Sequence, residues 1–503
     1  MHRFSAKGHE TKKDISILFS IFSFSGEKHS GMASKAIKKE YHMLKDWNLN
    51  KIFKPLMKKG ASFSDIYAED VESKSIVWED NKLEKVIGGH DIGIGLRAIK
   101  DLRTTYAYTN EAAEESVLSL SQEIGGVLGG RSAFSPRIWK FAPKPRRFPI
   151  IRNPQEISVQ EETDLLRLAN KVARGVDRRI QQVRVVYNTR TQKVFTANSD
   201  GESTSEVRVS TLFLVHAVAR EKDIIQTGYE PVAEARGFEL LPKDRVESIA
   251  LKAAKRAVNL LHARPAPSGP MTVVLSSSAG GTMIHEAVGH GLEADLAQEG
   301  LSVYSGKLGQ EVASKKISII DDATIDSARG SFFFDDEGVP AQKTVLVENG
   351  ILKDYLYDRL TAMKDGVEST GNGRRESYRS SPIPRMTNTF IASGESDPDE
   401  IIRSVEKGLC VIKMGGGQVD TVNGNFVFEV SEGYLLEKGH IGDMVRGATL
   451  IGNGPIIIKE IDMVGTDLGF GIGTCGKDGQ GVPVSDAQPT IRVPQIVVGG
   501  TET

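Results

Sequence analysis

A short segment of the chain combines residue types that can hold a metal ion and move a proton. His285 and His290 lie five positions apart, and Glu286 directly follows the first histidine. Imidazole nitrogens bind divalent metal ions, and a carboxylate beside such an ion can take a proton from water and return it to a leaving amine. The pattern HExxxH is therefore a candidate for metal-assisted hydrolysis. Two histidines with separate structural roles would give the same pattern, so the spacing alone leaves both interpretations open.

The spacing sets a condition on the helix that would carry these residues. In the HExxH pattern of zinc hydrolases, the two histidines are about 40° apart around the helix axis. Five residues put His285 and His290 about 140° apart, which is too far to share one zinc ion on a regular α-helix. One extra residue in the turn, a π-bulge, would bring both rings to one face, and Gly289 makes such a distortion easier. Metal binding by this pair therefore predicts a widened turn.

A catalytic zinc ion also needs a third protein ligand and an open position for water. The candidates are Glu293, one turn after His290, Cys475 in the segment GIGTCGKDGQGVPV, and the acidic group Asp335, Asp336 and Glu337. A thiolate is a soft ligand suited to zinc, and the glycines beside Cys475 allow the backbone to approach closely. The residues by themselves leave these candidates open.

The other cysteine and histidines have no such pattern. The chain has two cysteines in 503 residues, which argues against a disulfide framework and for a reducing compartment. Cys410, in the apolar segment GLCVIKM, is expected to be a small buried hydrophobic residue. The histidines expected to be structural or exposed are His90, His216, His262 and His440.

A second candidate segment is rich in arginine. The sequence GNGRRESYRSSPIPRMTN contains Arg374, Arg375, Arg379 and Arg385 among glycines and prolines. A guanidinium group fits carboxyl and carbonyl oxygens, so these residues are candidates for binding a peptide substrate. The alternative is that they pair with nearby acidic residues, which is common at protein surfaces.

Composition excludes some classes of partner. Lys and Arg number 64 and Asp and Glu 66, which leaves a net charge of −2. Such a balance provides no broad positive field, so neither nucleic acid nor a membrane is expected as a partner. Residues 1–32 resemble a signal peptide in the run ISILFSIFSF, but no small-residue cleavage pattern follows and the run is too short to span a bilayer. We expect this stretch to be a disordered extension.

The elements that must position the candidate residues fall into two halves. Alternating apolar and polar residues predict strands in 60–99, 181–201 and 209–220, and helical periodicity predicts helices in 110–128, 156–176 and 246–261. The segment HARPAPSGP, residues 262–270, interrupts the pattern and is typical of a linker. Short alternating runs follow, with one prominent helix at His285. The predicted fold class is α+β, with a mixed α/β domain at 33–268 and a mostly antiparallel β domain at 269–503.

Several long segments, in one order along the chain, resemble a known family. They are WEDNKLEKVIGGHDIGIGLRAI, GTMIHEAVGHGLEAD, GNGRRESYRSSPIPRMTN, GGGQVDTVNGNFVFEVSEGYLLEKG and GTCGKDGQGVPVSDAQPTIRVPQIVVGGT. Together they are similar to the TldD members of the TldD/PmbA (TldE) family. The resemblance runs from about residue 60 to the C-terminus, so it is far more specific than the histidine pattern alone.

The resemblance implies a zinc metallopeptidase of the bacterial and archaeal cytoplasm that degrades small unfolded peptides or trims leader peptides. It implies an α/β first domain, a twisted antiparallel C-terminal domain and a dimer, either of two like chains or of a TldD with a TldE subunit. Carried over residue by residue, it makes His285, His290 and Cys475 the ligands of Zn²⁺ and Glu286 the catalytic base. The partner branch of the family lacks HExxxH, so this chain resembles the catalytic branch.

Two other functions remain possible on the sequence. The segment HEAVGH also fits the HExxGH type of dipeptidyl peptidase, in which a glutamate such as Glu293 would be the third ligand. Alternatively, the chain could be a non-catalytic peptide-binding subunit whose metal ion is structural, with four protein ligands and no exchangeable water.

Overall fold

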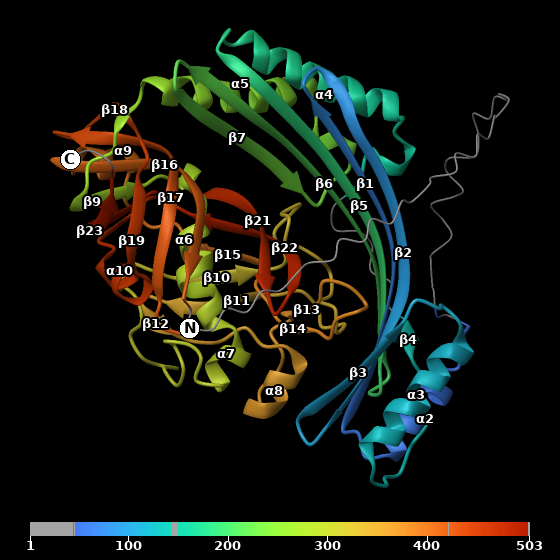
Figure 1. Cartoon of the computed structure of the whole chain (residues 1–503). Coiled ribbons are helices and arrows are strands. Elements are labelled where there is room, and N and C mark those ends of the chain that lie inside the picture. The colour runs from blue at the N-terminus through green and yellow to red at the C-terminus, as the bar shows by residue number, and fades with distance from the viewer. Residues whose placement is uncertain (1–43, 45, 142–148, 421, 501–503) are drawn as a thin grey trace, which may run out of the picture. The chain divides into compact units, whose positions relative to one another are not determined.

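The alternating runs of the N-terminal half form one sheet of long, mostly antiparallel strands (Figure 1). The computed structural model describes residues 44, 46–141, 149–420 and 422–500, and the predicted extension at 1–32 lies outside them. The strand order is β3-β2-β1-β5-β6-β4, and β7 also pairs with β6. The strands are β1 (Phe63–Glu79), β2 (Lys82–Lys100), β3 (Arg103–Thr109), β4 (Lys140–Phe141), β5 (Ile180–Asn198), β6 (Glu202–Glu221) and β7 (Ile224–Glu234).

Two pairs of helices pack against this sheet at opposite ends (Figure 1). The helices are α2 (Leu49–Lys58), α3 (Glu114–Leu128), α4 (Val159–Gly175) and α5 (Lys243–His262). The apolar positions of α5 repeat at helical spacing, and its side chains from Val246 to Leu261 on that face are buried against β6 and β7. The helices predicted over 110–128, 156–176 and 246–261 are therefore present.

The C-terminal half is built from two large sheets, a two-stranded sheet of residues 373–374 and 383–384, and several short helices. An eight-stranded sheet has the order β16-β9-β23-β19-β17-β18-β8, with β20 on β23, and a six-stranded sheet has the order β12-β11-β10-β15-β22-β21. Most pairings are antiparallel, as predicted, but β9 with β16, β15 with β22 and β8 with β18 are parallel. The fold is therefore mixed α and β.

The elements of this half have the following bounds. The strands are β8 (Arg264–Pro265), β9 (Gly269–Leu275), β10 (Ile319–Asp322), β11 (Lys343–Glu348), β12 (Ile351–Leu352), β13 (Gly373–Arg374), β14 (Ile383–Pro384), β15 (Asn388–Ile391), β16 (Lys407–Val419), β17 (Asn425–Glu437), β18 (His440–Arg446), β19 (Thr449–Asn453), β20 (Met463–Val464), β21 (Gly469–Lys477), β22 (Gln480–Gln488) and β23 (Ile491–Gly499). The helices are α6 (Thr282–Ile284), α7 (Ala294–Gln298), α8 (Arg359–Asp365), α9 (Pro398–Arg403) and α10 (Gly454–Glu460).

Buried ion pairs join the N-terminal sheet to the C-terminal half. Arg97 in β2 is almost fully buried and pairs with both Asp65 in β1 and Glu337. Arg208 in β6 pairs with Asp336 at 2.7 Å. A buried charge that loses its partner is costly, so these pairs hold the two halves in one arrangement. Residues Met43–Thr503 accordingly form one compact unit, and the division at residues 268 and 269 stays a prediction.

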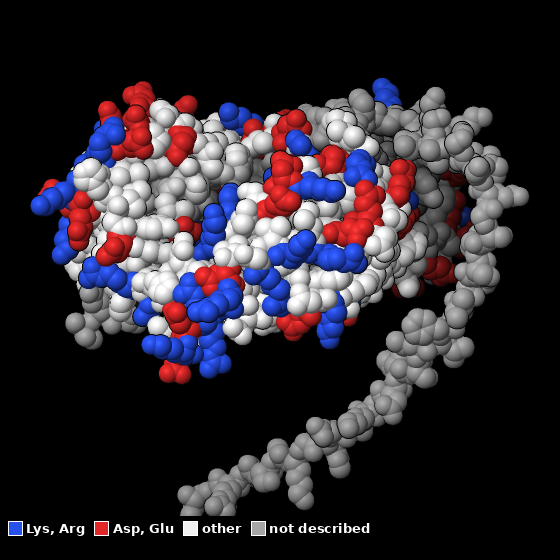
Figure 2. Space-filling model, turned by 90° about the horizontal axis from the view of Figure 1, so that it is seen from above, with Lys and Arg blue, Asp and Glu red and all other residues white. Residues whose placement is uncertain are grey.

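The surface has no broad region of a single charge on the face seen in Figure 2, where basic and acidic side chains are mixed. Within the described ranges, no helix has both the length and the apolar character needed to cross a bilayer.

Candidate metal centre

His285 and His290 lie on a turn that is wider than an α-helix. After the short α6, the backbone forms a π-helical turn over His285–Gly289 and a 3-10 turn over His290–Leu292. The N–H of His290 donates to the carbonyl of His285, which is the hydrogen bond of a π-helix. The sequence predicted one prominent helix here, whereas the structure has a short helix of three successive geometries, which puts both rings on one side.

Gly289 is required in this turn by packing. Its backbone is ordinary right-handed helix, with φ −56°, so the glycine is not needed for an unusual conformation. A Cβ atom added at this position would instead overlap the sulfur of Met386. The structure therefore gives Gly289 a role in packing, because Met386, just before β15, approaches the turn closely, and the role of Gly289 in easing the distortion stays a prediction.

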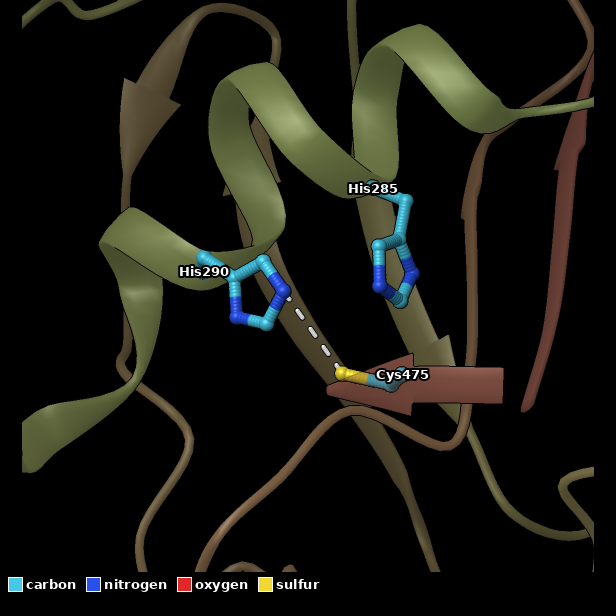
Figure 3. A group of neighbouring side chains, drawn as sticks. All are labelled: His285, His290 and Cys475. Atoms are coloured by element: carbon cyan, nitrogen blue, oxygen red, sulfur yellow. Dashed lines mark hydrogen bonds between the residues drawn. The ribbon is translucent and has the colours of Figure 1, made fainter. Parts of the chain in front are cut away.

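The two histidines meet Cys475, which comes from β21, 185 residues further along the chain than His290 (Figure 3). Their potential ligand atoms all lie within 4.8 Å of one another, and all three residues are buried. The Cys475 Sγ to His290 Nε2 distance is 3.6 Å. A tetrahedral zinc ion with bonds of about 2.0–2.1 Å to nitrogen and about 2.3 Å to sulfur would hold two such ligands about 3.5 Å apart. The donor set and its spacing therefore fit zinc.

Glu293 orients His290 from the other side of the ring. Its Oε2 lies 3.0 Å from His290 Nδ1 and 3.1 Å from the Nζ of Lys477. A carboxylate on the outer nitrogen of an imidazole ligand fixes the ring and its tautomer, as is usual around metal sites. Glu293 is therefore a positioning residue, and in this geometry it does not share the ligand cluster with Cys475.

The pKa values and unpartnered atoms of the cluster favour the binding of a cation. Burial alone would raise the pKa of Cys475, but hydrogen bonds with His285 and His290 lower it to about 5. Burial opposes protonation of His290, yet Glu293 and Cys475 hold the pKa of His290 well above its usual value. The Nδ1 of His285 is buried and has no hydrogen-bond partner among the described residues. A thiolate, two imidazoles and a nitrogen without a hydrogen-bond partner in the protein are features expected of residues that bind a metal ion.

Zinc binding at pH 7 is expected to release protons, mainly from His290. The raised pKa of His290 favours a protonated ring, from which the metal would displace the proton, whereas the lowered pKa of Cys475, about 5, favours the thiolate. Zinc affinity should therefore rise with pH. The variant Glu293→Gln removes a cause of the raised pKa, so it should release fewer protons per zinc. Titration calorimetry in buffers of different ionisation enthalpy measures this number, and equal release by both proteins would refute the expectation.

Glu286 lies beside the cluster without belonging to it. Its side chain is half-buried, and within the described ranges it has no hydrogen bond or ion pair. Its electrostatic neighbour is Asp486 in β22, whose own pKa is raised by burial. Asp486 accepts a hydrogen bond from the N–H of Gly281 and also interacts with His285. A carboxylate next to the ligands with free oxygens can act as a proton carrier.

A cavity of about 910 Å³ adjoins this turn. It is lined by Thr282 of α6, Asp486 of β22 and part of β21, and also by residues of β7, α5, β16 and β17. Cavities of roughly 300–1,000 Å³ are typical of ligand-binding sites. Asp486 thus connects the cavity to Glu286 and His285.

The acidic group at 335–337 is engaged elsewhere and is not a source of the third ligand. Asp335 accepts hydrogen bonds from the backbone of Glu337, Val339 and Gly373. Asp336 and Glu337 form the ion pairs with Arg208 and Arg97 described above. These acids are part of the contact between the two halves of the chain, which the local sequence could not indicate.

The four predicted substrate-binding arginines differ in their contacts. Arg374 and Arg375 are buried, and they donate mainly to backbone carbonyls, including that of Pro483 for Arg374 and that of Asp336 for Arg375. Arg379 is exposed and pairs with Asp91. Their contact with a peptide stays a prediction, since the contacts present are with the protein itself.

Arg385 supports the strand that carries Cys475. It is fully buried, and its guanidinium donates to the backbone carbonyls of Cys475 and Gln480, which flank the turn between β21 and β22. This arginine therefore fixes the strand that carries the cysteine. Its predicted role in substrate binding likewise stays a prediction, and the structure gives it a supporting contact to the metal centre.

The remaining cysteine and histidines behave as expected. Cys410 in β16 is fully buried among apolar side chains, and burial raises its pKa to about 11. His90 is exposed and pairs with Asp70 at 2.8 Å. His216 is partly buried within β6, and His262 and His440 lie near strand or helix ends. Lys477 and Asp486 were missed from the sequence, because nothing local marks them as neighbours of the histidines.

Comparison with family models identifies three successive matches. The models describe the PmbA/TldA metallopeptidase domain 1 at residues 64–123, the central domain at 152–261 and the C-terminal domain at 268–500. Among full-length relatives, the chain is 37% identical to a metalloprotease TldD homologue of Buchnera aphidicola over 87% of this chain and 93% of that protein. It is 36% identical to a metalloprotease TldD homologue of Haemophilus influenzae over 90% and 95%.

More distant relatives extend the comparison. A zinc metalloprotease TldD homologue of Saccharolobus solfataricus is 29% identical over 88% of this chain and 97% of its own. Among solved structures, a proposed modulator of a DNA gyrase from Thermotoga maritima superposes with a TM-score of 0.73 at 24% identity, over 90% of this chain and 99% of that one. TldE from Thermococcus kodakarensis superposes with a TM-score of 0.69 at 19% identity, over 90% and 100%. These structures share the fold.

Proposed function

The chain belongs to the PmbA/TldD metallopeptidase family, and on that premise we propose that it is a zinc-dependent peptidase acting on small unfolded peptides or leader peptides. The observation that carries the proposal is the convergence of His285, His290 and Cys475 with Glu286 beside them. Three protein ligands leave a fourth position for water or substrate, which is the arrangement of catalytic rather than structural zinc.

The residues of the site have distinct parts in this proposal. His285, His290 and Cys475 would hold the ion, which would supply a Lewis acid that polarises the scissile carbonyl and lowers the pKa of water. Glu286 takes a proton from the attacking water and gives it to the nitrogen of the leaving amine. Glu293 and Lys477 keep the His290 ring in place, and Arg385 keeps the Cys475 strand in place.

The surroundings of the site favour extended substrates. The cavity beside the turn is lined by residues of the long strand β7 and of β21 and β22. A peptide lying along a strand edge is held through its backbone, so many sequences can bind. A folded protein cannot supply such a free strand, which supports a preference for unfolded or terminal segments.

The geometry of the site gives less support to a dipeptidyl peptidase or to a non-catalytic subunit with a structural metal ion. A dipeptidyl peptidase of the HExxGH type would need Glu293 as ligand, but its carboxylate is engaged by His290 Nδ1 and Lys477. A structural metal site would have four protein ligands, whereas the ligand group found among the described residues has three members.

The proposal also covers the oligomeric state, the cellular location and the domain arrangement of the enzyme. We propose that the chain works as a dimer, either with a like chain or with a TldE-type subunit, as the family resemblance implies. We also propose a cytoplasmic location, in keeping with a chain that has two unpaired cysteines. The domain arrangement would be an α/β domain to residue 268 followed by the metallopeptidase domain.

Peptide digestion tests this function directly. The zinc-loaded chain, alone and with a TldE-type subunit, should cleave an unstructured peptide but not a folded protein, as followed by mass spectrometry. A chelator should abolish cleavage and added zinc should restore it. The absence of cleavage under both conditions, or cleavage that persists in chelator, would contradict the proposal.

A further inference from the structure

The cavity beside the metal centre contains an arginine whose charge the protein leaves unbalanced. Arg329 is half-buried and lines the cavity between β7 and β21. Its backbone N–H donates to Ser485 Oγ at 3.1 Å, and its Nε donates to the carbonyl of Gly473 at 3.2 Å. The base of this side chain is therefore fixed to β21 and β22, the two strands that also carry Cys475 and Asp486.

Of the other cations that line this cavity, Arg236, Arg245 and Lys413 have acidic partners, whereas Lys252 is exposed to solvent. Arg245 pairs with Glu234 at 2.7 Å, and Lys413 pairs with Glu230 at 2.8 Å. Within the described ranges, Arg329 has no carboxylate partner, and its two terminal nitrogens have no hydrogen bond to protein. A guanidinium has five N–H donors, so most of the donors of Arg329 remain available to a ligand.

Burying the Arg329 guanidinium without an acidic partner costs free energy, and a bound anion would offset this cost. Removal from water lowers the pKa of Arg329, and the neighbouring Tyr229 offsets this only in part. A carboxylate placed against the guanidinium would form two parallel charge-assisted hydrogen bonds, which are stronger in a partly desolvated site than in water.

The position of Arg329 relates it to the scissile bond. Gly473, which holds its Nε, is two residues before Cys475 in β21. Strand residues advance about 3.3 Å each, so this anchor point is about 7 Å along the strand from the cysteine. An extended peptide that ran alongside β21 would advance by a similar distance per residue, so on that path Arg329 would meet the peptide a few residues from the reacting carbonyl.

We propose that Arg329 is a specificity-determining residue that binds a carboxylate of the peptide substrate within this cavity, an inference that rests on the proposed peptidase function. The carboxylate can be the C-terminal group of the peptide or the side chain of an Asp or Glu residue. In the first case the enzyme releases short C-terminal fragments, and in the second it selects an acidic residue near the cleavage point.

Binding measured without turnover tests the inference separately from catalysis. The background is the full chain carrying Glu286→Gln and loaded with zinc, and the measurement is fluorescence anisotropy of labelled unstructured peptides. Three peptides of one sequence are compared: a neutral peptide that is C-terminally amidated and free of acids, the same peptide with a free C-terminus, and the amidated peptide with single Gln→Glu changes.

A charge-assisted pair predicts about tenfold or tighter binding of at least one carboxylate-bearing peptide over the neutral one. Arg329→Gln should remove this difference and leave binding of the neutral peptide unchanged, which shows that the site is still folded. Arg329→Lys should keep part of the preference. Lys252→Gln, the same loss of charge at the exposed rim of the cavity, should change the preference less than about twofold.

The outcomes are distinct. A preference that survives Arg329→Gln, or no preference in the protein with Arg329 intact, would overturn the inference. Preference for the free C-terminus or for one Glu position identifies the source of the carboxylate. If the Glu286-containing enzyme cleaves none of the peptides while the Arg329-dependent preference is present, the peptidase function fails and the carboxylate site stands.

Discussion

Replacing Glu286 by glutamine is expected to reduce peptide hydrolysis about 100- to 10,000-fold while zinc stays bound. Glutamine has nearly the same shape but cannot accept the proton of the attacking water at neutral pH. Glu286 is not among the residues that form the ligand cluster, so its loss of charge should not release the metal. Initial rates of peptide cleavage and zinc content per chain, measured on one preparation, check both parts of the expectation.

A matched control comes from the same segment. Glu299, at the end of α7, is exposed, so Glu299→Gln makes the same chemical change away from the site. This variant should keep the activity of the parent chain. Cleavage by Glu286→Gln at the rate of the Glu299→Gln control would exclude Glu286 as the proton carrier, whatever the metal content.

Replacing Cys475 by alanine is expected to weaken zinc binding far more than replacing Glu293 by alanine. Cys475 is the sulfur ligand in the proposed site, and its thiolate charge balances part of the charge of the ion. Glu293 acts through the ring of His290, and loss of such a partner typically costs about 10- to 100-fold in metal affinity or activity. Competition with a chromophoric chelator measures the two dissociation constants.

The same substitution at the second cysteine separates ligation from packing. Cys410→Ala removes a buried thiol from an apolar cluster, so stability falls slightly but zinc affinity should stay as it was. If Cys475→Ala retained zinc and Glu293→Ala lost it, the carboxylate would be the third ligand and the HExxGH alternative would be the better description.

Local periodicity was sufficient to predict much of the fold. The helix α5 and the long strands β1, β2, β5 and β6 follow apolar spacing that a single element can satisfy by itself. The spacing of His285 and His290 also implies a π-type turn if both bind one ion, because a regular α-helix cannot put the two rings on one face. Both predictions depend only on residues that are close together in the sequence.

Contacts between distant segments could not be predicted in this way. Cys475 reaches the histidines from a strand 185 positions after His290, and only the resemblance to a family distinguished it from Glu293. The arginines of the segment at 371–388 were candidates for substrate binding from the sequence, but tertiary packing buries Arg374, Arg375 and Arg385. The role of Glu293 did have a local signal, since it follows His290 by three residues on one turn.

The central claim is that two imidazoles and one thiolate surround a single zinc ion with a position left for water. X-ray absorption at the zinc edge of the loaded chain measures this shell directly. We predict two nitrogen neighbours at about 2.0–2.1 Å, one sulfur neighbour at about 2.3 Å and one exchangeable light atom, with the sulfur signal lost in Cys475→Ala. A spectrum with light atoms alone, or a sulfur signal unchanged by that substitution, would contradict the account.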